Sequence, residues 1–343
     1  MRKKICKMLS LIFFAVMVVT MNGCASKTNN NSETIRVACF PNVTHAQALL
    51  GKNTHYFAEK LGEDVQIDWK FFNSGNPEIE AFFAGELDLG FIGPIPAING
   101  FEKSEGEIII LSGAVNGGAV LVARQDSEVD GVLDLANKKV AVPSFGNTQD
   151  FMLRMMLDEN GLKEISEGGN VEIIPVKNPD LQSFFGQGLI DAAFVPEPWG
   201  TQLVESGLAK MVLDVKETWR GGDYPTTVII GRKSFVEQNG ETVRKFLEAH
   251  LELTEQYSGD QDATGARINE EILNITGGSL AEDILKASLG KIEMSINPQR
   301  EALHGLAEAM YARKFINTQV DTVKLCNFEI VNSILAEREQ ENI

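Results

Sequence analysis

The sequence contains few residues of the kinds that build catalytic or metal centres. Its 343 residues include four His and four Cys. No two His have the spacing of metal ligands, and the patterns H-E-x-x-H, C-x-x-C, G-x-S-x-G and G-x-x-x-x-G-K-[ST] do not occur. Because the common metal, redox, hydrolase and phosphate-binding motifs are missing, we predict that the protein is not an enzyme and has no metal site or cofactor.

Basic residues are also scarce. The chain has 31 Lys and Arg against 48 Asp and Glu, a net charge of −17. The first 23 residues hold four basic residues and no acidic one, so without them 27 basic residues remain and the net charge is about −21. A field of that sign argues against binding to nucleic acid or to anionic lipid surfaces.

The longest apolar run lies near the N-terminus. Met8 to Met21 spans roughly 14 residues after four basic ones, which is shorter than the ~18 that cross a bilayer. We therefore predict a signal peptide over residues 1–23. The run ends in Asn22-Gly23-Cys24, which resembles the cleavage site of a bacterial lipoprotein and implies that Cys24 is lipidated, for example with palmitate. Residues 24–33 are predicted to be this Cys and a flexible polar tether. The alternative to lipidation is an ordinary cleaved signal with an incidental Cys.

Only two further cysteines would remain in the mature chain. Cys39 and Cys326 are too far apart in the sequence to form the disulfide framework of a small secreted domain. We favour two buried thiols, with a Cys39–Cys326 bridge as the alternative.

What the sequence does contain is an internal repeat. Asn76 to Pro94 and Asn178 to Glu197 share the order Asn-Pro-acid, Phe-Phe, Gly, Asp and a closing β-type run, with one inserted residue. The segments starting at Val37 and Val140 also match, since each is a β-type run followed by a turn and a helical pattern. The repeat predicts an α/β fold with two similar lobes, in which free N–H groups at helix starts face a ligand cleft between them.

The order of the predicted elements gives the domain boundaries. The chain leaves the first lobe near Ala123 and returns near Gly222, because β-type and helical patterns resume on either side of these points. We therefore expect lobe 1 to comprise residues 34–123 plus 223–343, with a largely parallel sheet, and lobe 2 to comprise residues 124–222. Two crossings of this kind form a hinge.

The loop Gly146 to Asp150 is the first candidate site. Gly146 permits close approach of the backbone, Asn147 or Thr148 can cap the next helix, and Gln149 offers an amide donor and acceptor. Such neutral donors hold sulfonate, nitrate or carboxylate groups without an Arg. The alternative is a plain helix cap.

The turn Pro196-Glu197-Pro198-Trp199 is the second candidate. It follows a β-type run, at the end of the sheet where open α/β folds bind ligands. Glu197 would accept a hydrogen bond from the ligand and Trp199 would form an apolar wall. Alternatively, Glu197 caps the next helix and Trp199 packs in the core. Gly93 and Pro94 would face this turn from the other lobe.

Taken together, the loop at 146–150, Asn178-Pro179-Asp180 and Pro196-Glu197-Pro198-Trp199 resemble the solute-binding proteins of bacterial ABC importers for nitrate, taurine and aliphatic sulfonates. The resemblance implies a two-lobed, type II-like periplasmic-binding-protein fold with two hinge crossings. It also implies a monomer that is lipid-anchored outside a bacterial membrane and delivers its ligand to membrane permease subunits. The ligand contacts expected from it are Asn42, Gly93, Pro94, Asn116, Gly117, Gly146, Asn147, Thr148, Gln149, Glu197, Trp199 and Tyr224.

The expected function is capture of a small oxyanion by closure of the lobes. An aliphatic sulfonate or taurine is preferred, because a carboxylate at Glu197 would suit a zwitterion. Nitrate, bicarbonate and a pyrimidine thiamine precursor are the alternative ligands. The alternative functions are an enzyme of pyrimidine biosynthesis on the same fold and a surface adhesin.

Overall fold

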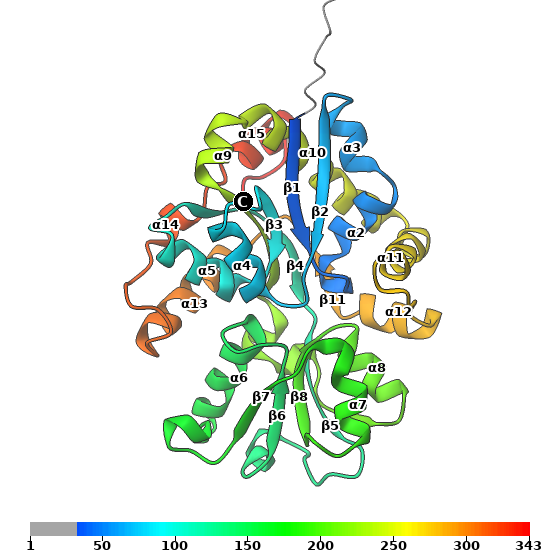
Figure 1. Ribbon diagram of the computed structural model, residues 1–343, viewed down its shortest axis with the longest axis vertical. Coiled ribbons are helices and arrows are strands. Elements are labelled where there is room, and N and C mark those ends of the chain that lie inside the picture. Colours follow the sequence, from blue (N-terminus) through cyan, green and yellow to red (C-terminus); the bar gives the residue numbers. More distant parts are fainter. Residues whose placement is uncertain (1–32) are drawn as a thin grey trace, which may run out of the picture. The chain divides into compact units, whose positions relative to one another are not determined.

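The computed structural model describes residues 33–343, which form two β-sheets flanked by helices (Figure 1). The first sheet has six strands in the order β11-β4-β10-β3-β1-β2. Their bounds are β1 Glu33–Cys39, β2 Val65–Phe71, β3 Leu89–Ile92, β4 Ile108–Gly117, β10 Pro225–Arg232 and β11 Ile292–Met294. β1 and β3 are parallel, whereas β10 is antiparallel to both β3 and β4. The sheet is therefore mixed, and the prediction of a largely parallel sheet was wrong.

The second sheet has five strands in the order β7-β6-β8-β5-β9. They are β5 Ala119–Arg124, β6 Lys139–Val142, β7 Glu172–Pro175, β8 Ala192–Pro196 and β9 Ala209–Leu213. β6 is parallel to β7 and β8, and β5 is antiparallel to β8 and β9. The two sheets are therefore built alike: in each, one antiparallel strand lies between the parallel strands and the remaining strands. This strand is β10 in the first sheet and β5 in the second.

The chain passes between the sheets earlier than the sequence predicted. β4 ends at Gly117 and β5 begins at Ala119, so Gly118 alone separates strands that belong to different sheets. Gly117 and Gly118 have φ of +70° and +78°, which glycine adopts without steric penalty. The sequence pattern places residues 119–123 in lobe 1, whereas the strand that they form pairs within the second sheet. An apolar strand pattern does not say which sheet the strand joins.

Helices cover both sheets, and most of them belong to the first. Around the first sheet lie η1 Val43–His45, α2 Ala46–Asn53, α3 Tyr56–Leu61, α4 Gly75–Phe83, α5 Pro94–Lys103, α9 Lys233–Gln238, α10 Gly240–Gly259, α11 Gln261–Thr276, α12 Glu282–Leu289, α13 Arg300–Ala312, α14 Thr322–Leu325 and α15 Glu329–Glu337. Around the second lie η2 Val132–Leu135, α6 Thr148–Glu159, η3 Ile165–Glu167, η4 Asn178–Asp180, α7 Leu181–Gly186, α8 Trp199–Glu205, η5 Val215–Glu217 and η6 Trp219–Gly222. All ten residues of β4 are buried, because helices cover it on both faces.

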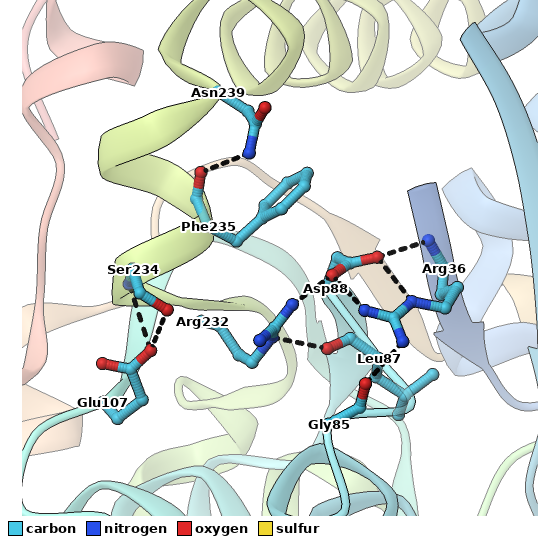
Figure 2. Close-up of polar contacts among 9 residues, drawn as sticks. All are labelled: Arg36, Gly85, Leu87, Asp88, Glu107, Arg232, Ser234, Phe235 and Asn239. Carbon is cyan, nitrogen blue, oxygen red and sulfur yellow. Dashed lines mark hydrogen bonds and ion pairs between the residues drawn. The ribbon is translucent and has the colours of Figure 1, made fainter. Parts of the chain in front are cut away.

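A buried carboxylate ties three neighbouring strands of the first sheet together (Figure 2). Asp88, just before β3, accepts hydrogen bonds from Arg36 of β1 at 2.7–2.9 Å and from Nη2 of Arg232, at the end of β10, at 2.5 Å. Arg36 also donates to the carbonyl of Gly85, and Arg232 to that of Leu87. This network connects β1, β3 and β10 at the end of the sheet where β3 begins.

The core of the first sheet contains stacked aromatic rings. Phe57 and Phe246 lie 4.5 Å apart between ring centroids and are almost wholly buried. Cys39 and Cys326 are both free, with Cys39 buried in β1 and Cys326 half-buried, so the preference for thiols over a bridge is confirmed. The predicted signal peptide, Cys24 and the tether up to residue 32 lie outside the described residues.

Candidate ligand-binding site

A small cavity lies where strands of both sheets end. Its volume is about 30 Å³, room for roughly two water molecules. Residues that end or follow β1, β3, β6 and β8 contribute to it, and ligands of open α/β sheets bind at such carboxyl ends. The lining consists of Phe40, Asn42, Thr44, His45, Asn73, Ser74, Gly75, Gly93, Pro96, Pro143, Asn147, Thr148, Gln149, Asn178, Pro196 and Thr226.

Three α-helices and one 3-10 helix begin at this cavity. Their N-cap residues all belong to the lining: Asn42 precedes η1, Ser74 precedes α4, Gly93 precedes α5 and Asn147 precedes α6. The N–H groups in the first turn of a helix have no partner within it, and the helix dipole adds partial positive charge there. The cavity is therefore surrounded by groups that favour an anion.

The four N-caps differ in how many N–H groups they leave free. Asn147 accepts a hydrogen bond from the backbone N–H of Asp150 at 2.9 Å, and its amide donates to Gln149 at 3.1 Å. Asn42, Ser74 and Gly93 make no side-chain cap hydrogen bond. The amides at the starts of η1 and α4 are thus left for solvent or a ligand.

Two side chains of the lining have buried polar atoms without a protein partner. They are the hydroxyl of Thr148 and Oδ1 of Asn178, in residues that are 3% and 4% exposed. An unpaired buried polar group costs about 1–3 kcal/mol, and native structures keep few of them. A ligand in the cavity would supply the missing hydrogen bonds.

His45 is a neutral member of the lining. Burial lowers its pKa to about 3, so the ring is uncharged near neutral pH. Its Nδ1 accepts from the N–H of Phe40 at 3.3 Å, which leaves the proton on Nε2 as a donor. The Phe40 ring lies 4.3 Å away between centroids. His45 therefore contributes a hydrogen-bond donor without a charge.

No lining residue, within the described part of the chain, has a charged side chain, and the carboxylates of Glu78, Asp150 and Glu197 lie outside the lining. Burial raises the pKa of Glu78, in the first turns of α4, well above its usual value. Burial also raises the pKa of Asp150 and Glu197, but each has a cation beside it: Arg154 at 2.9 Å and Lys291 at 3.3 Å. The helix starts therefore dominate the electrostatics of the cavity.

The neutral form of Glu78 gives a testable dependence on pH. Both Glu78 oxygens are buried without a partner. Because burial raises the pKa of the folded state, the carboxyl lowers stability as pH rises above its unfolded pKa, by up to about 1.4 kcal/mol per pH unit until the folded pKa is passed. Glu78→Gln should therefore gain in unfolding free energy over wild type from about pH 5 to 8, measured by urea denaturation. The exposed neighbour variant Glu80→Gln is the control, and a gain that stays flat with pH contradicts the prediction.

Five of the twelve ligand contacts expected from the sequence line the cavity. They are Asn42, Gly93, Asn147, Thr148 and Gln149. They follow strands of both sheets, and Gly93 lies against Thr148: a Cβ on Gly93 would lie 2.2 Å from the Thr148 hydroxyl. The structure thus brings together the starts of α5 and α6.

Glu197 and Trp199 lie outside the lining. Glu197 is fully buried and accepts from the backbone N–H of Thr201 at 3.1 Å and from its hydroxyl at 3.0 Å, so it holds the first turn of α8. Trp199 packs on the core of the second sheet, and its Nε1 is buried without a partner. These contacts match the alternative interpretation of the turn, a helix cap and a core residue.

The other expected contacts are not among the residues that line the cavity. Asn116 and Gly117 end β4 at the crossing, and Tyr224 is buried with its ring 5.7 Å from that of Trp219. Gly146 has φ of +72° and donates its N–H to Asp150 at 2.7 Å, which shapes the loop before α6. Pro94 is the first residue of α5 and has no N–H to offer.

Eleven residues of the lining were not among the contacts expected from the sequence. For one group of them, the sequence contains a recognisable helix-start pattern. This group precedes α4, which begins at Gly75. Asn73-Ser74-Gly75 after β2 is a helix-start pattern, with Ser74 as a favourable N-cap. The missed residues are Phe40, Thr44, His45, Asn73, Ser74, Gly75, Pro96, Pro143, Asn178, Pro196 and Thr226.

Within residues 33–343, His, Cys, Asp and Glu do not gather in groups of three or more that could hold a metal ion. No helix of this part is both long and apolar enough to span a bilayer.

Comparison with known proteins identifies relatives by sequence. The chain is 27% identical over 207 residues to the taurine-binding periplasmic protein of Escherichia coli K12, a match that covers 60% of this chain and 61% of that protein. It is 25% identical over 299 residues to a putative aliphatic sulfonates-binding protein of Bacillus subtilis, covering 81% and 86%. The chain thus spans less than two thirds of the first of these relatives.

Solved structures share the fold. The alkanesulfonate-binding protein SsuA from Xanthomonas axonopodis pv. citri, bound to MOPS, superposes with a TM-score of 0.72 at 17% identity, covering 86% of this chain and 98% of that one. The periplasmic nitrate-binding protein NrtA from Synechocystis gives 0.73 at 16% identity, covering 89% of both. The predicted α/β periplasmic-binding-protein fold is therefore confirmed.

The family itself follows from a further match. The resemblance to taurine-, sulfonate- and nitrate-binding proteins noted in the sequence is confirmed by these relatives. The pattern of the NMT1-like family matches residues 28–271, well over half of the chain, and the chain therefore belongs to the NMT1-like family.

Proposed function

We propose that this protein is the extracytoplasmic substrate-binding component of an ABC importer and captures a small oxyanion, an aliphatic sulfonate or taurine. One observation carries the proposal: four helix starts and no charged side chain surround a cavity in which Thr148 and Asn178 lack partners. Oxyanions are the ligands that such N–H groups hold. The names of the relatives point to the same ligand class.

In this proposal the two sheets, each with its helices, are two lobes that close on the ligand. Gly118 and the segment between β9 and β10 are the crossings. Contacts from each side meet at the cavity: Gly93 against Thr148, and the Asn76 amide, which donates to the Phe145 carbonyl at 2.5 Å. Opening the cleft would break these contacts and a bound ligand would restore them, which is the general logic of hinge closure.

The proposal includes an anchor and a partner. Cys24 would carry lipid on the outer face of a bacterial membrane, and residues 25–33 would tether the protein there. The monomeric receptor would release its ligand to permease subunits in that membrane. No bond is made or broken in this process, so no residue has a catalytic role.

Lipidation of Cys24 is tested by radiolabelled palmitate incorporation, which Cys24→Ala should abolish.

Ligand-induced stabilisation tests the proposed ligand class. Residues 25–343 include the whole compact unit from Thr34 to Ile343. A ligand at 100 times its dissociation constant should stabilise it by about 2.7 kcal/mol, seen as a rise in melting temperature. The panel contains alkanesulfonates, taurine, nitrate, bicarbonate and pyrimidines, and we expect a sulfonate to give the rise.

Thr148→Ala should lower the affinity for that ligand about tenfold, since it removes one hydrogen bond in a dry site.

The control for this variant is Thr264→Ala in α11, which lies away from the cavity. If nitrate, bicarbonate or a pyrimidine alone raises the melting temperature, the receptor function stands with another ligand. If no compound does so for protein freed of carried-over ligand, the receptor proposal fails and the adhesin alternative gains support. Turnover of a bound compound would support an enzyme.

A further inference from the structure

We infer that the cavity selects an oxyanion with no ammonium group near its head, so that isethionate and ethanesulfonate bind more tightly than taurine. The inference rests on the proposed function and narrows its ligand class. It reverses the preference for a zwitterion that the sequence suggested, because that preference depended on Glu197.

Glu197 is not available to a ligand ammonium. Its carboxylate accepts from the N–H and hydroxyl of Thr201 and lies 3.3 Å from Nζ of Lys291. Lys291 in turn lies 3.4 Å from Asp214. The side chain of Glu197 is fully buried and does not line the cavity. The negative charge of Glu197 is therefore already paired with groups of the protein itself.

Two further carboxylates, those of Asp150 and Glu78, are also unsuited to bind a ligand cation. Asp150 accepts from the N–H of Gly146 and from Arg154, which pairs further with Glu167 at 2.7 Å. Glu78 is fully buried behind Gly90, where a Cβ would lie close to its Oε1, and it does not line the cavity. A ligand ammonium would thus leave water without gaining a carboxylate partner, which is unfavourable.

The unpaired polar atoms of the lining serve an anion as well as they could serve a cation. The amide of Asn178 can present its NH₂ group after rotation about its last torsion, and the hydroxyl of Thr148 is a donor as well as an acceptor. His45 adds an N–H donor. The lining can thus turn several donors towards a sulfonate, whereas an ammonium would find only neutral acceptors.

The helix starts decide between the two ligands. The partial positive charges at Ser74, Gly93 and Asn147 attract a sulfonate and repel an ammonium. The ammonium of taurine is only two carbons from its sulfonate, so both groups lie in the same field. Taurine should consequently gain less from the site than a sulfonate that carries a hydroxyl at the same place.

Isothermal titration of residues 25–343 with three ligands tests the inference. Taurine and isethionate are nearly equal in size and differ in carrying an ammonium or a hydroxyl, and ethanesulfonate carries neither. At pH 7 we expect taurine to bind at least tenfold more weakly than isethionate. Taurine that binds as tightly as isethionate, or more tightly, overturns the inference and leaves the proposed function intact. If no sulfonate binds, the proposed ligand class fails and the inference with it.

A variant should reverse the selectivity. Asn178→Asp is nearly isosteric and places a carboxylate at the unpaired Oδ1. We expect it to weaken isethionate about 100-fold and taurine less, so that taurine becomes the better ligand. Asn160→Asp, at the exposed C-terminal end of α6, adds the same charge away from the cavity and should change neither affinity. Equal losses of both ligands in Asn178→Asp contradict the inference, and circular dichroism shows whether that variant is folded; if it is not, the titration of the wild-type protein decides.

Discussion

Replacement of Asp88 by alanine is expected to lower the free energy of unfolding by about 3 kcal/mol. Asp88 is almost wholly buried and joins Arg36 and Arg232 across three strands (Figure 2). Removal of the carboxylate leaves two guanidinium groups at the end of the sheet without their shared partner. Because both arginines remain partly exposed, at 33% and 26%, water can solvate them and the loss should not exceed this range.

Chemical denaturation at several pH values measures this effect. Burial opposes ionisation of Asp88, but hydrogen bonds from Arg36 and Arg232 hold its pKa below the usual value. Its contribution is therefore present above the unfolded pKa of about 3.9 and is lost as pH falls through the folded pKa. The difference between wild type and Asp88→Ala should persist from pH 5 to 8 and shrink in acid.

The matched control for this variant is an exposed pair. Asp126 is 76% exposed and lies 2.5 Å from Arg124. Asp126→Ala should change the unfolding free energy by less than about 1 kcal/mol, since water screens such pairs. Similar losses for both variants would mean that the buried network has no special role in stability.

The second large effect expected is a loss of ligand affinity when the proposed closure of the two lobes is obstructed. Gly93→Leu should weaken ligand binding about 100-fold, or about 2.7 kcal/mol. A side chain there would occupy the position of the Thr148 hydroxyl and hold the two helix starts apart. The backbone of Gly93 has φ −67° and ψ 153°, which every residue adopts, so the variant should fold normally.

Titration with the ligand found in the stabilisation panel measures this loss. Gly240→Leu is the control, because Gly240 starts α10 in open space with no atom within 4 Å of its Cβ. The melting temperature of ligand-free Gly93→Leu should match that of the control. An unchanged affinity in Gly93→Leu would show that the approach of Gly93 to Thr148 is not needed for binding.

The sequence was most informative where a pattern repeats or keeps a period. The repeat around Asn76 and Asn178 predicted two similar α/β units, and the structure has two sheets that are each flanked by helices. The loop before α6 was also found, because Gly146 and Asn147 have local roles in a turn and a cap. Such features depend on neighbours in the chain.

Features that depend on distant partners could not be predicted in the same way. The apolar run that forms β5 does not specify its pairing with β8 and β9, so the sequence does not show that it joins the second sheet. The role of Glu197 depends on Lys291, which lies 94 positions later in the sequence. His45 lines the cavity because of the path that the chain takes after β1. A single His in a helical pattern does not indicate such a position.

The neutral lining of the cavity has a kinetic consequence in solutions of different salinity. The chain as a whole has a net charge of −17 and repels an approaching anion at long range. Dissolved salt screens this repulsion, since the Debye length falls to ~8 Å at physiological ionic strength. In the proposed closed complex, the contacts between ligand and lining would exclude these ions. Salt should therefore speed the arrival of the ligand and leave the lifetime of the complex almost unchanged.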